Sequence, residues 1–264
     1  MAAGLGNREP STGTWSSPTI IYSGLGIYSL KTATNDNGDI VLVWSEQSEV
    51  GKETMVMKSK YYDATNKTWS DVTTIGNVPT GGLSSNSKMV QYIDVVMDSQ
   101  GDVGVIWKDN SLVINTGGGA SLRSNYYDAG TNTWVIDPAL TLVVTGNDLL
   151  DFTIPQLAID QNRDLVLAYT SSASILESKV FSHTTHTWKA INRVDGNQII
   201  FPATNYPDPA FPANLYVATV QNVKLAANTN GNIYAIWKNV DVNGKERLFF
   251  NKYDNLPSSP KLSM

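Results

Sequence analysis

Of the acidic residues in the segments that differ between four otherwise related quarters of the sequence, four are candidates for chemistry, because carboxylates are the groups that could do it there. They are Glu46, Asp109, Asp148 and Asp151. Two facing carboxylates can hydrolyse a glycosidic bond, and several together can bind calcium through their oxygens. The Asp-x-Asp-x-Asp-Gly spacing of a calcium loop is absent, and charged loop residues are usually only solvated. We therefore treat the four as ligand-binding candidates and expect no catalytic residue and no metal site.

The longest variable segment, residues 201–216, contains four prolines. Prolines restrict the backbone, so the aromatic side chains between them can be held ready to stack on a sugar or on a partner's side chain at low entropic cost. The alternative is a lid that packs over its own part of the chain. We take Tyr206, Asp208 and Phe211 as the candidates for ligand specificity.

A third group of polar residues stands four residues before the Asn or Asp that opens each of four similar turns. These residues are Lys31, Asp94, Gln156 and Lys224. If they lie on equivalent innermost strands, they line a central channel, where two Lys, one Gln and one Asp could hold an anion, a carboxylate or ordered water. The alternative is a solvated channel lined with paired charges.

Other chemistry is poorly represented. Cys is absent, so disulfides, thiolate metal sites and cysteine nucleophiles are excluded. The two histidines, His183 and His186, replace ordinary turn residues and have no third ligand nearby in the sequence, which argues against zinc. No Gly-x-Ser-x-Gly elbow and no phosphate-binding loop is present. We expect no cofactor, with a structural cation or anion in the central channel left open.

The elements that position these residues follow from an internal repeat. Four turns rich in Asn, Asp and Gly each precede an apolar run that ends in an aromatic residue six positions later. The aromatic residues recur at intervals of 62 to 68 positions and are Trp44, Trp107, Tyr169 and Trp237. In the third turn Arg163 stands where the others have Gly, so we expect that turn to be strained or differently shaped.

Each repeat has a second half, in which a strand ending in Tyr or Phe is followed by a Thr-Trp pair. The pairs are Thr68-Trp69, Thr133-Trp134 and Thr187-Trp188; the fourth repeat lacks one, and a spare pair, Thr14-Trp15, stands near the amino terminus. Short apolar runs bounded by turn residues, without a helical period, predict four strands per repeat. All-β repeats of four strands are typical of propeller blades.

We therefore predict an all-β, four-bladed β-propeller with four antiparallel strands per blade, in one domain spanning residues 1–264. Blade 1 covers about 27–78, blade 2 about 90–145, blade 3 about 153–195, and blade 4 about 220–256 plus 13–22. The amino-terminal strand would pair with the strand ending at Tyr253 and close the ring, which removes open sheet edges. A larger ring, two chains sharing one ring, and a duplicated sandwich are the alternatives.

The segments from Tyr62-Asp63 to Trp69 and from Tyr127-Asp128 to Trp134 resemble the end of a kelch repeat. The kelch double glycine and the sialidase Asp-box are absent. The whole repeat is more similar to those of bacterial secreted or surface β-propeller proteins. This resemblance implies the fold and leaves the function to be argued from the site.

Composition narrows the range of partners. The chain has 264 residues, 41% hydrophobic and 16% charged, with a net charge of -5, which fits one globular domain and argues against nucleic acid as a ligand. The longest apolar runs are about five residues, so no transmembrane segment is predicted, because a span needs about 20.

The variable loops of a propeller share one face, and such loops usually carry binding sites. We expect a non-enzymatic module that binds a carbohydrate or a protein, located outside the cell or on its surface, with the cytoplasm left open. The alternative is a glycan-processing hydrolase or lyase that uses loop carboxylates near the channel mouth. A structural assembly protein is a third reading.

Overall fold

The computed structural model describes residues 2–5, 13–15, 17–49, 55–78, 90–109, 121–136, 142–144, 154–170, 176–190, 221–228, 232–240 and 246–254. All regular elements in these ranges are β-strands, so the predicted all-β class is confirmed. No helix in the described ranges is long and apolar enough to cross a membrane.

Most strands form four successive antiparallel sheets, each built from consecutive hairpins, and we call these sheets blades 1 to 4. Blade 1 contains β3 (Ile27–Thr34), β4 (Ile40–Gln47), β5 (Met55–Asp63), β6 (Thr68–Trp69) and β7 (Thr73–Val78). Blade 2 contains β8 (Val90–Met97), β9 (Val103–Asp109), β10 (Ser121–Asp128), β11 (Thr133–Trp134) and β12 (Leu142–Val144). Blade 3 contains β13 (Gln156–Ile159), β14 (Leu165–Thr170), β15 (Leu176–Ser182) and β16 (Thr187–Ala190), and blade 4 contains β17 (Gln221–Ala227), β18 (Asn232–Val240) and β19 (Glu246–Asp254).

The strand order within blades 1 to 3 is the predicted one. The first three strands pair in sequence order, and the outermost position is filled by the Thr-Trp strand. In blades 1 and 2 this position is split, because β6 and β7 both pair with β5, and β11 and β12 both pair with β10. Each blade is therefore a small meander, and its first strand lies beside the first strand of the next blade.

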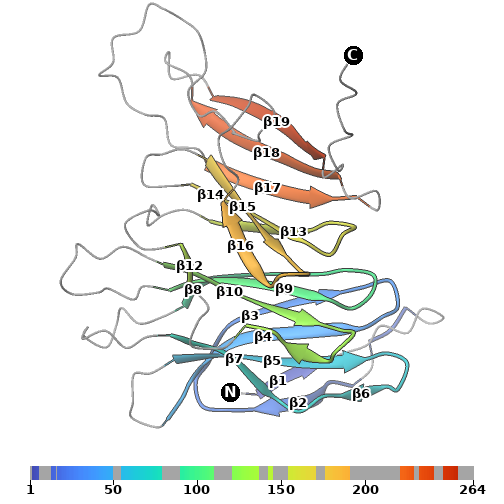
Figure 1. Ribbon diagram of the computed structural model, residues 1–264. Coiled ribbons are helices and arrows are strands. Elements are labelled where there is room, and N and C mark those ends of the chain that lie inside the picture. The colour runs from blue at the N-terminus through green and yellow to red at the C-terminus, as the bar shows by residue number, and fades with distance from the viewer. Residues whose placement is uncertain are drawn as a thin grey trace, which may run out of the picture.

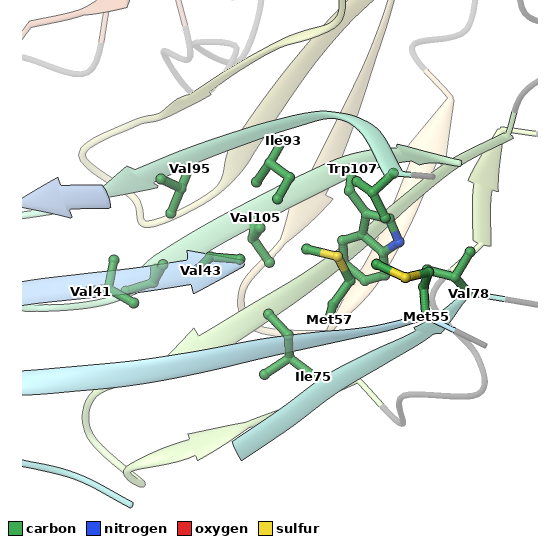
Figure 2. Packing of buried hydrophobic residues seen from close by; sticks show 12 residues of the cluster. Val41, Val43, Met55, Met57, Ile75, Val78, Ile93, Val95, Val105 and Trp107 are labelled. Atoms are coloured by element: carbon green, nitrogen blue, oxygen red, sulfur yellow. The ribbon is translucent and has the colours of Figure 1, made fainter. Parts of the chain in front are cut away.

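The blades stack face to face (Figure 1), and the clusters of buried apolar residues combine side chains of successive blades. Figure 2 shows the largest cluster, in which apolar side chains of blade 1 meet those of blade 2. Contributors from blade 1 are Val41, Val43, Met57 and Ile75, and those from blade 2 are Ile93, Val95, Val105 and Trp107. Blades 2 and 3 also pack closely, because a methyl group added to Gly104 of blade 2 would overlap Leu165 of blade 3. Burial between successive sheets is thus what holds the array together.

The repeated turns are built as their residue types predict. The side chain of the opening Asn or Asp accepts hydrogen bonds from backbone N–H groups two and four residues later in blades 1, 2 and 3. Gly38 and Gly101 adopt positive φ angles of 87° and 93°. Arg163, their counterpart, has a φ of 68°. The expected strain in the third turn is confirmed, because a side chain at positive φ is sterically disfavoured.

The amino-terminal segment forms a separate hairpin, in which β1 (Ala2–Leu5) pairs antiparallel with β2 (Thr19–Ser23). Among the described residues, the predicted pairing of residues 13–22 with the strand that ends at Tyr253 is absent. The sheet β17–β18–β19 has three strands among the described residues, and Figure 1 shows β2 and β19 at opposite ends of the array. The physical reason is this separation: the stacking of the blades carries β19 away from β2, and β2 pairs with the neighbouring strand β1 instead. Closure of a ring is therefore not shown by the described residues, in which β19 has no outer strand beside it.

Candidate functional site

The four equivalent polar residues Lys31, Asp94, Gln156 and Lys224 lie on β3, β8, β13 and β17, the first strand of each blade. These four strands neighbour one another in that order, so the side chains occur at equivalent positions along neighbouring first strands. We call this set the inner-strand row. The two lysines are exposed, Asp94 is half-buried and Gln156 is buried.

Hydrogen bonds connect members of the inner-strand row across blades. Lys224 Nζ donates to Gln156 Oε1 over 3.2 Å. Gln156 Nε2 donates to the Tyr92 hydroxyl over 2.8 Å and to the Pro155 carbonyl over 2.9 Å. Blades 2, 3 and 4 are therefore linked at this level, and the Gln156 amide is held in one orientation.

Asp94 lies between two lysines without forming a direct ion pair in the described structure. Its Oδ2 accepts from the backbone N–H of Leu157 in blade 3 over 2.9 Å, and its Oδ1 accepts from that of Val95 over 3.2 Å. Burial raises the pKa of Asp94, and this effect outweighs the two hydrogen bonds and the positive charges of Lys31 and Lys224. The lysine amines remain available to an external group.

Tyr92 belongs to the site, although the repeat gave no reason to select it. It stands two residues before Asp94 on β8, at the position of Ser29 in blade 1. Burial, together with the charge of Asp94, raises the pKa of Tyr92 to about 12, so the phenol stays protonated at neutral pH. Since its oxygen accepts from Gln156, the hydroxyl proton can be donated to a ligand.

Chemically, the row and Tyr92 together offer cationic donors, a phenol donor and an amide on neighbouring strands. Such groups can bind hydroxyl and carboxylate oxygens by charge-assisted hydrogen bonds. Their mutual contacts hold the buried members in place, which lowers the entropic cost of binding.

Glu46 lies in the interior, whereas the sequence placed it in a variable loop. Strand β4 continues to Gln47, and the Glu46 carboxylate accepts from Tyr22 OH over 2.8 Å, Trp44 Nε1 over 3.1 Å and the Leu25 N–H over 3.2 Å. Lys58 Nζ lies 3.1 Å from it. Burial alone would raise the pKa of Glu46, but these hydrogen bonds outweigh burial and lower the pKa. These contacts fasten β2 to blade 1.

The remaining ligand-binding candidates cannot be placed from the structure. Asp109 is the last residue of β9, and its side chain is outside the described part. Asp148, Asp151, Tyr206, Asp208 and Phe211 lie outside the described residues altogether.

A second polar cluster connects the turns of blades 2 and 3. The buried carboxylate of Asp102 accepts from the guanidinium of Arg163, from Tyr126 OH over 2.8 Å and from the Ala129 N–H over 2.8 Å. Burial would raise the pKa of Asp102, yet the Arg163 contact and the other donors hold it below its usual range. The cluster is saturated by its own members, which indicates a structural role.

The described ranges contain no cluster of metal ligands. No set of three His, Asp or Glu side chains there could hold an ion. His183 contacts Asp164 through Nδ1 at 3.2 Å, with the Asp164 carboxylate also accepting from the His183 backbone N–H. These contacts connect the turn between β13 and β14 with the turn that follows β15 in blade 3.

Comparison with known proteins reveals distant similarity in structure alone. No protein-family profile matches the chain, and a search of curated proteins finds no match. Among solved structures, the polysaccharide lyase Uly1 superposes with a TM-score of 0.37 at 10% identity, over 86% of this chain and 57% of the lyase. A mutant of AofleA from Arthrobotrys oligospora gives 0.42 at 13% identity, over 90% of this chain and 59% of AofleA.

A mutant of the Aleuria aurantia lectin AAL, in complex with Fucalpha1-6GlcNAc, gives a TM-score of 0.38 at 13% identity, over 95% of this chain and 70% of the lectin. The chain thus spans less than two thirds of the length of the lyase and of AofleA. These likenesses are distant in both sequence and superposition, so they say what the chain is similar to and carry no functional conclusion.

Proposed function

We propose that the chain is a non-enzymatic binding module, working outside the cell or on its surface, whose ligand is a carbohydrate with acidic groups. The observation that supports this proposal is the inner-strand row. Lys31 and Lys224 expose their amines on either side of the half-buried Asp94, and Tyr92 keeps a protonated hydroxyl beside Gln156.

Carbohydrates match this set of groups because each hydroxyl both donates and accepts hydrogen bonds. A sugar carboxylate or sulfate would add charge-assisted bonds to the two amines. Tyr28, three residues before Lys31 on β3, is 40% exposed and offers an aromatic surface near the same end of the strand. Small sites that combine an aromatic surface with a few fixed polar groups are typical of ligand binding.

An enzymatic role has less support in the described residues. Glycoside hydrolysis needs two carboxyl groups that flank the scissile bond, whereas Asp94 is the single acidic member of the row and both its oxygens accept backbone N–H groups. Tyr206, Asp208 and Phe211 stay as candidates for specificity, on the strength of the sequence.

A glycan array screened with the intact protein tests the proposal, followed by titration calorimetry with the best ligand. Lys31→Ala and Lys224→Ala each remove one exposed amine, and Lys189→Ala, which removes an exposed lysine from β16, is the matched control. A hydrogen bond to a charged group contributes about 1.5–3 kcal/mol, so each row variant is expected to bind roughly 10- to 100-fold more weakly. The control should bind like the wild type.

Two outcomes would overturn the proposal. Binding to no glycan on the array would exclude a carbohydrate ligand and direct attention to protein partners. A glycan that binds all three variants as tightly as the wild type would show that the row is not the site.

A further inference from the structure

The two ends of the array expose apolar residues whose counterparts are buried in the other blades. Leu248 of β19 is 78% exposed and Ile236 of β18 is 48% exposed. The residues at the position of Leu248 are Met57, Leu122 and Leu176, which are 0 to 1% exposed; those at the position of Ile236 are Val43, Ile106 and Ala168, all 0% exposed. These counterparts pack against the following blade. Blade 4 therefore carries a face built to receive another blade.

Blade 1 carries the opposite face. Leu30 of β3 is 50% exposed, whereas Ile93 and Val223, its counterparts on β8 and β17, are 2% and 6% exposed. Ile93 belongs to the core that blade 2 forms with the preceding blade 1. The surface around Leu30 is thus the kind that packs on a preceding blade, and the repeat makes it complementary to the surface around Leu248.

Strand β2 already occupies the place of a preceding blade's outer strand. Lys60 Nζ donates to the carbonyl of Ile21 on β2 over 3.0 Å. Side chains at the same position in blades 2 and 3 make the same kind of contact with the outer strand of the preceding blade. Asn125 Nδ2 donates to the carbonyl of Ile75 on β7, and Lys179 Nζ donates to the carbonyl of Val143 on β12, both over 2.8 Å. Blade 1 is therefore bound by β2 as blade 2 is by β7.

The pairing of β2 shows which strand it can accept. In blade 1, the outer strand β7 pairs with the third strand β5, and the register of this pair shifts between Met57 and Lys58. The β1–β2 pair has a shift at the matching point, between Ala3 and Gly4. Strand β1, with four residues, thus stands where a third strand of a blade belongs. Strand β19 is the third strand of the one blade that lacks an outer strand among the described residues, and it has nine residues.

We propose that two copies of this chain associate head to tail, with β2 of one copy completing the sheet β17–β18–β19 of the other. The face of blade 4 around Leu248 and Ile236 then packs on blade 1 of the partner, and β19 replaces β1 beside β2. The occupant is a second copy because blade 1 carries the complementary face, while in a single chain β2 and β19 lie at opposite ends of the array (Figure 1). The contact is heterologous, so it yields a closed dimer if the rotation closes and longer assemblies if it does not.

Sedimentation velocity over a wide concentration range tests the association. The wild type is expected to form dimers or larger species, and Leu248→Glu and Leu30→Glu should each reduce it to a monomer, because a charge would be buried without a partner. Leu142→Glu is the matched control, since Leu142 is 48% exposed on β12, away from both ends. A wild type that stays monomeric, or an assembly that survives both end variants, would overturn the proposal.

Cysteine cross-linking tests the strand pairing and is simple because the chain has no cysteine. The register of β5 with β7 pairs Ser59 with Thr73, which places Phe250 opposite Thr19 in the proposed sheet. Opposed residues in an antiparallel pair have Cα atoms about 4.5–5.5 Å apart, within disulfide range. Mixing Thr19→Cys with Phe250→Cys should give a disulfide-linked heterodimer, and replacing the first with Thr65→Cys, in an exposed turn, should not.

The double variant Thr19→Cys/Phe250→Cys separates association from closure within one chain. Disulfide-linked dimers or chains support the proposal. A disulfide formed within a monomer would overturn it, because β2 would then complete blade 4 of its own chain.

Discussion

The ion pair between blades 2 and 3 leads to a quantitative stability prediction. Arg163 holds a φ of 68°, a conformation that costs about 1 kcal/mol or more for a residue with a side chain. In return its guanidinium donates to the Asp102 carboxylate, with Nη2 2.6 Å from Oδ1. Removing one partner of a buried pair costs about 3–5 kcal/mol. We use about 3 kcal/mol, because the Arg163 side chain is 25% exposed.

Arg163→Gly removes the pair and relieves the strained turn, so the expected net loss in unfolding free energy is about 2 kcal/mol at pH 7. The assay is urea unfolding of the wild type, Arg163→Gly, Asp102→Asn and the double variant. The double variant should lose less than the sum of the single losses, by about 1–3 kcal/mol, because the two residues share one interaction.

The pH dependence has a defined sign. The pKa of Asp102 is lowered in the folded state, so its stabilising effect is complete above the unfolded pKa of about 3.9 and is lost as the pH falls through the folded pKa. The gap between wild type and Asp102→Asn should therefore be constant from neutral pH down to about 5 and shrink below about 4. Equal or greater stability of Arg163→Gly at pH 7 would refute this reasoning, as would strict additivity in the double variant.

Three further changes test other parts of the structure. Gly104→Ala should lower stability by about 1–3 kcal/mol in urea unfolding, because the added methyl overlaps Leu165; Gly130→Ala, in an exposed turn, is the control. The pKa of Asp94 is raised by burial, so its pH trend should be opposite to that of Asp102. In the same urea assay, the wild type should gain stability relative to Asp94→Asn as the pH falls from 7 towards 4. A stability difference that does not change with pH would contradict the assignment. Glu46→Gln should weaken the attachment of β2 and speed hydrogen exchange of the β2 amides at neutral pH, whereas unchanged exchange would show that the Glu46 charge is dispensable there.

The repeat in the sequence predicted much of the fold. Turn residues at equal spacing from an aromatic predicted the strand order within blades 1 to 3, and the replacement of Gly by Arg163 predicted a strained turn. Both inferences depend on local chemistry, in which turn residues and strand periodicity act over a few positions. The ion pair that stabilises Arg163 was not predictable, because Asp102 lies 61 positions away and meets it only when blades 2 and 3 stack.

The failures concern contacts between elements distant in the sequence. The segment 13–22 was assigned as the outer strand of blade 4. Its second half belongs to strand β2, which accepts a hydrogen bond from Lys60 of blade 1. The strand that pairs with β2 is β1. Glu46 was placed in a loop because nothing in its local sequence shows that Tyr22 and Lys58 would surround it. Tyr92 was missed for the same reason, since its partner Gln156 comes from the next blade.

The most direct test of the binding site is the affinity of the best acidic glycan for the wild type and for the variant Lys31→Ala/Lys224→Ala, measured by titration calorimetry at low and high salt. We predict that the double variant binds at least about 10-fold more weakly at low salt. We also predict that it loses most of the salt dependence seen in the wild type, because salt screens exposed charges. Equal affinities and equal salt dependence would contradict the account, because the two exposed amines of the inner-strand row would then play no part in binding.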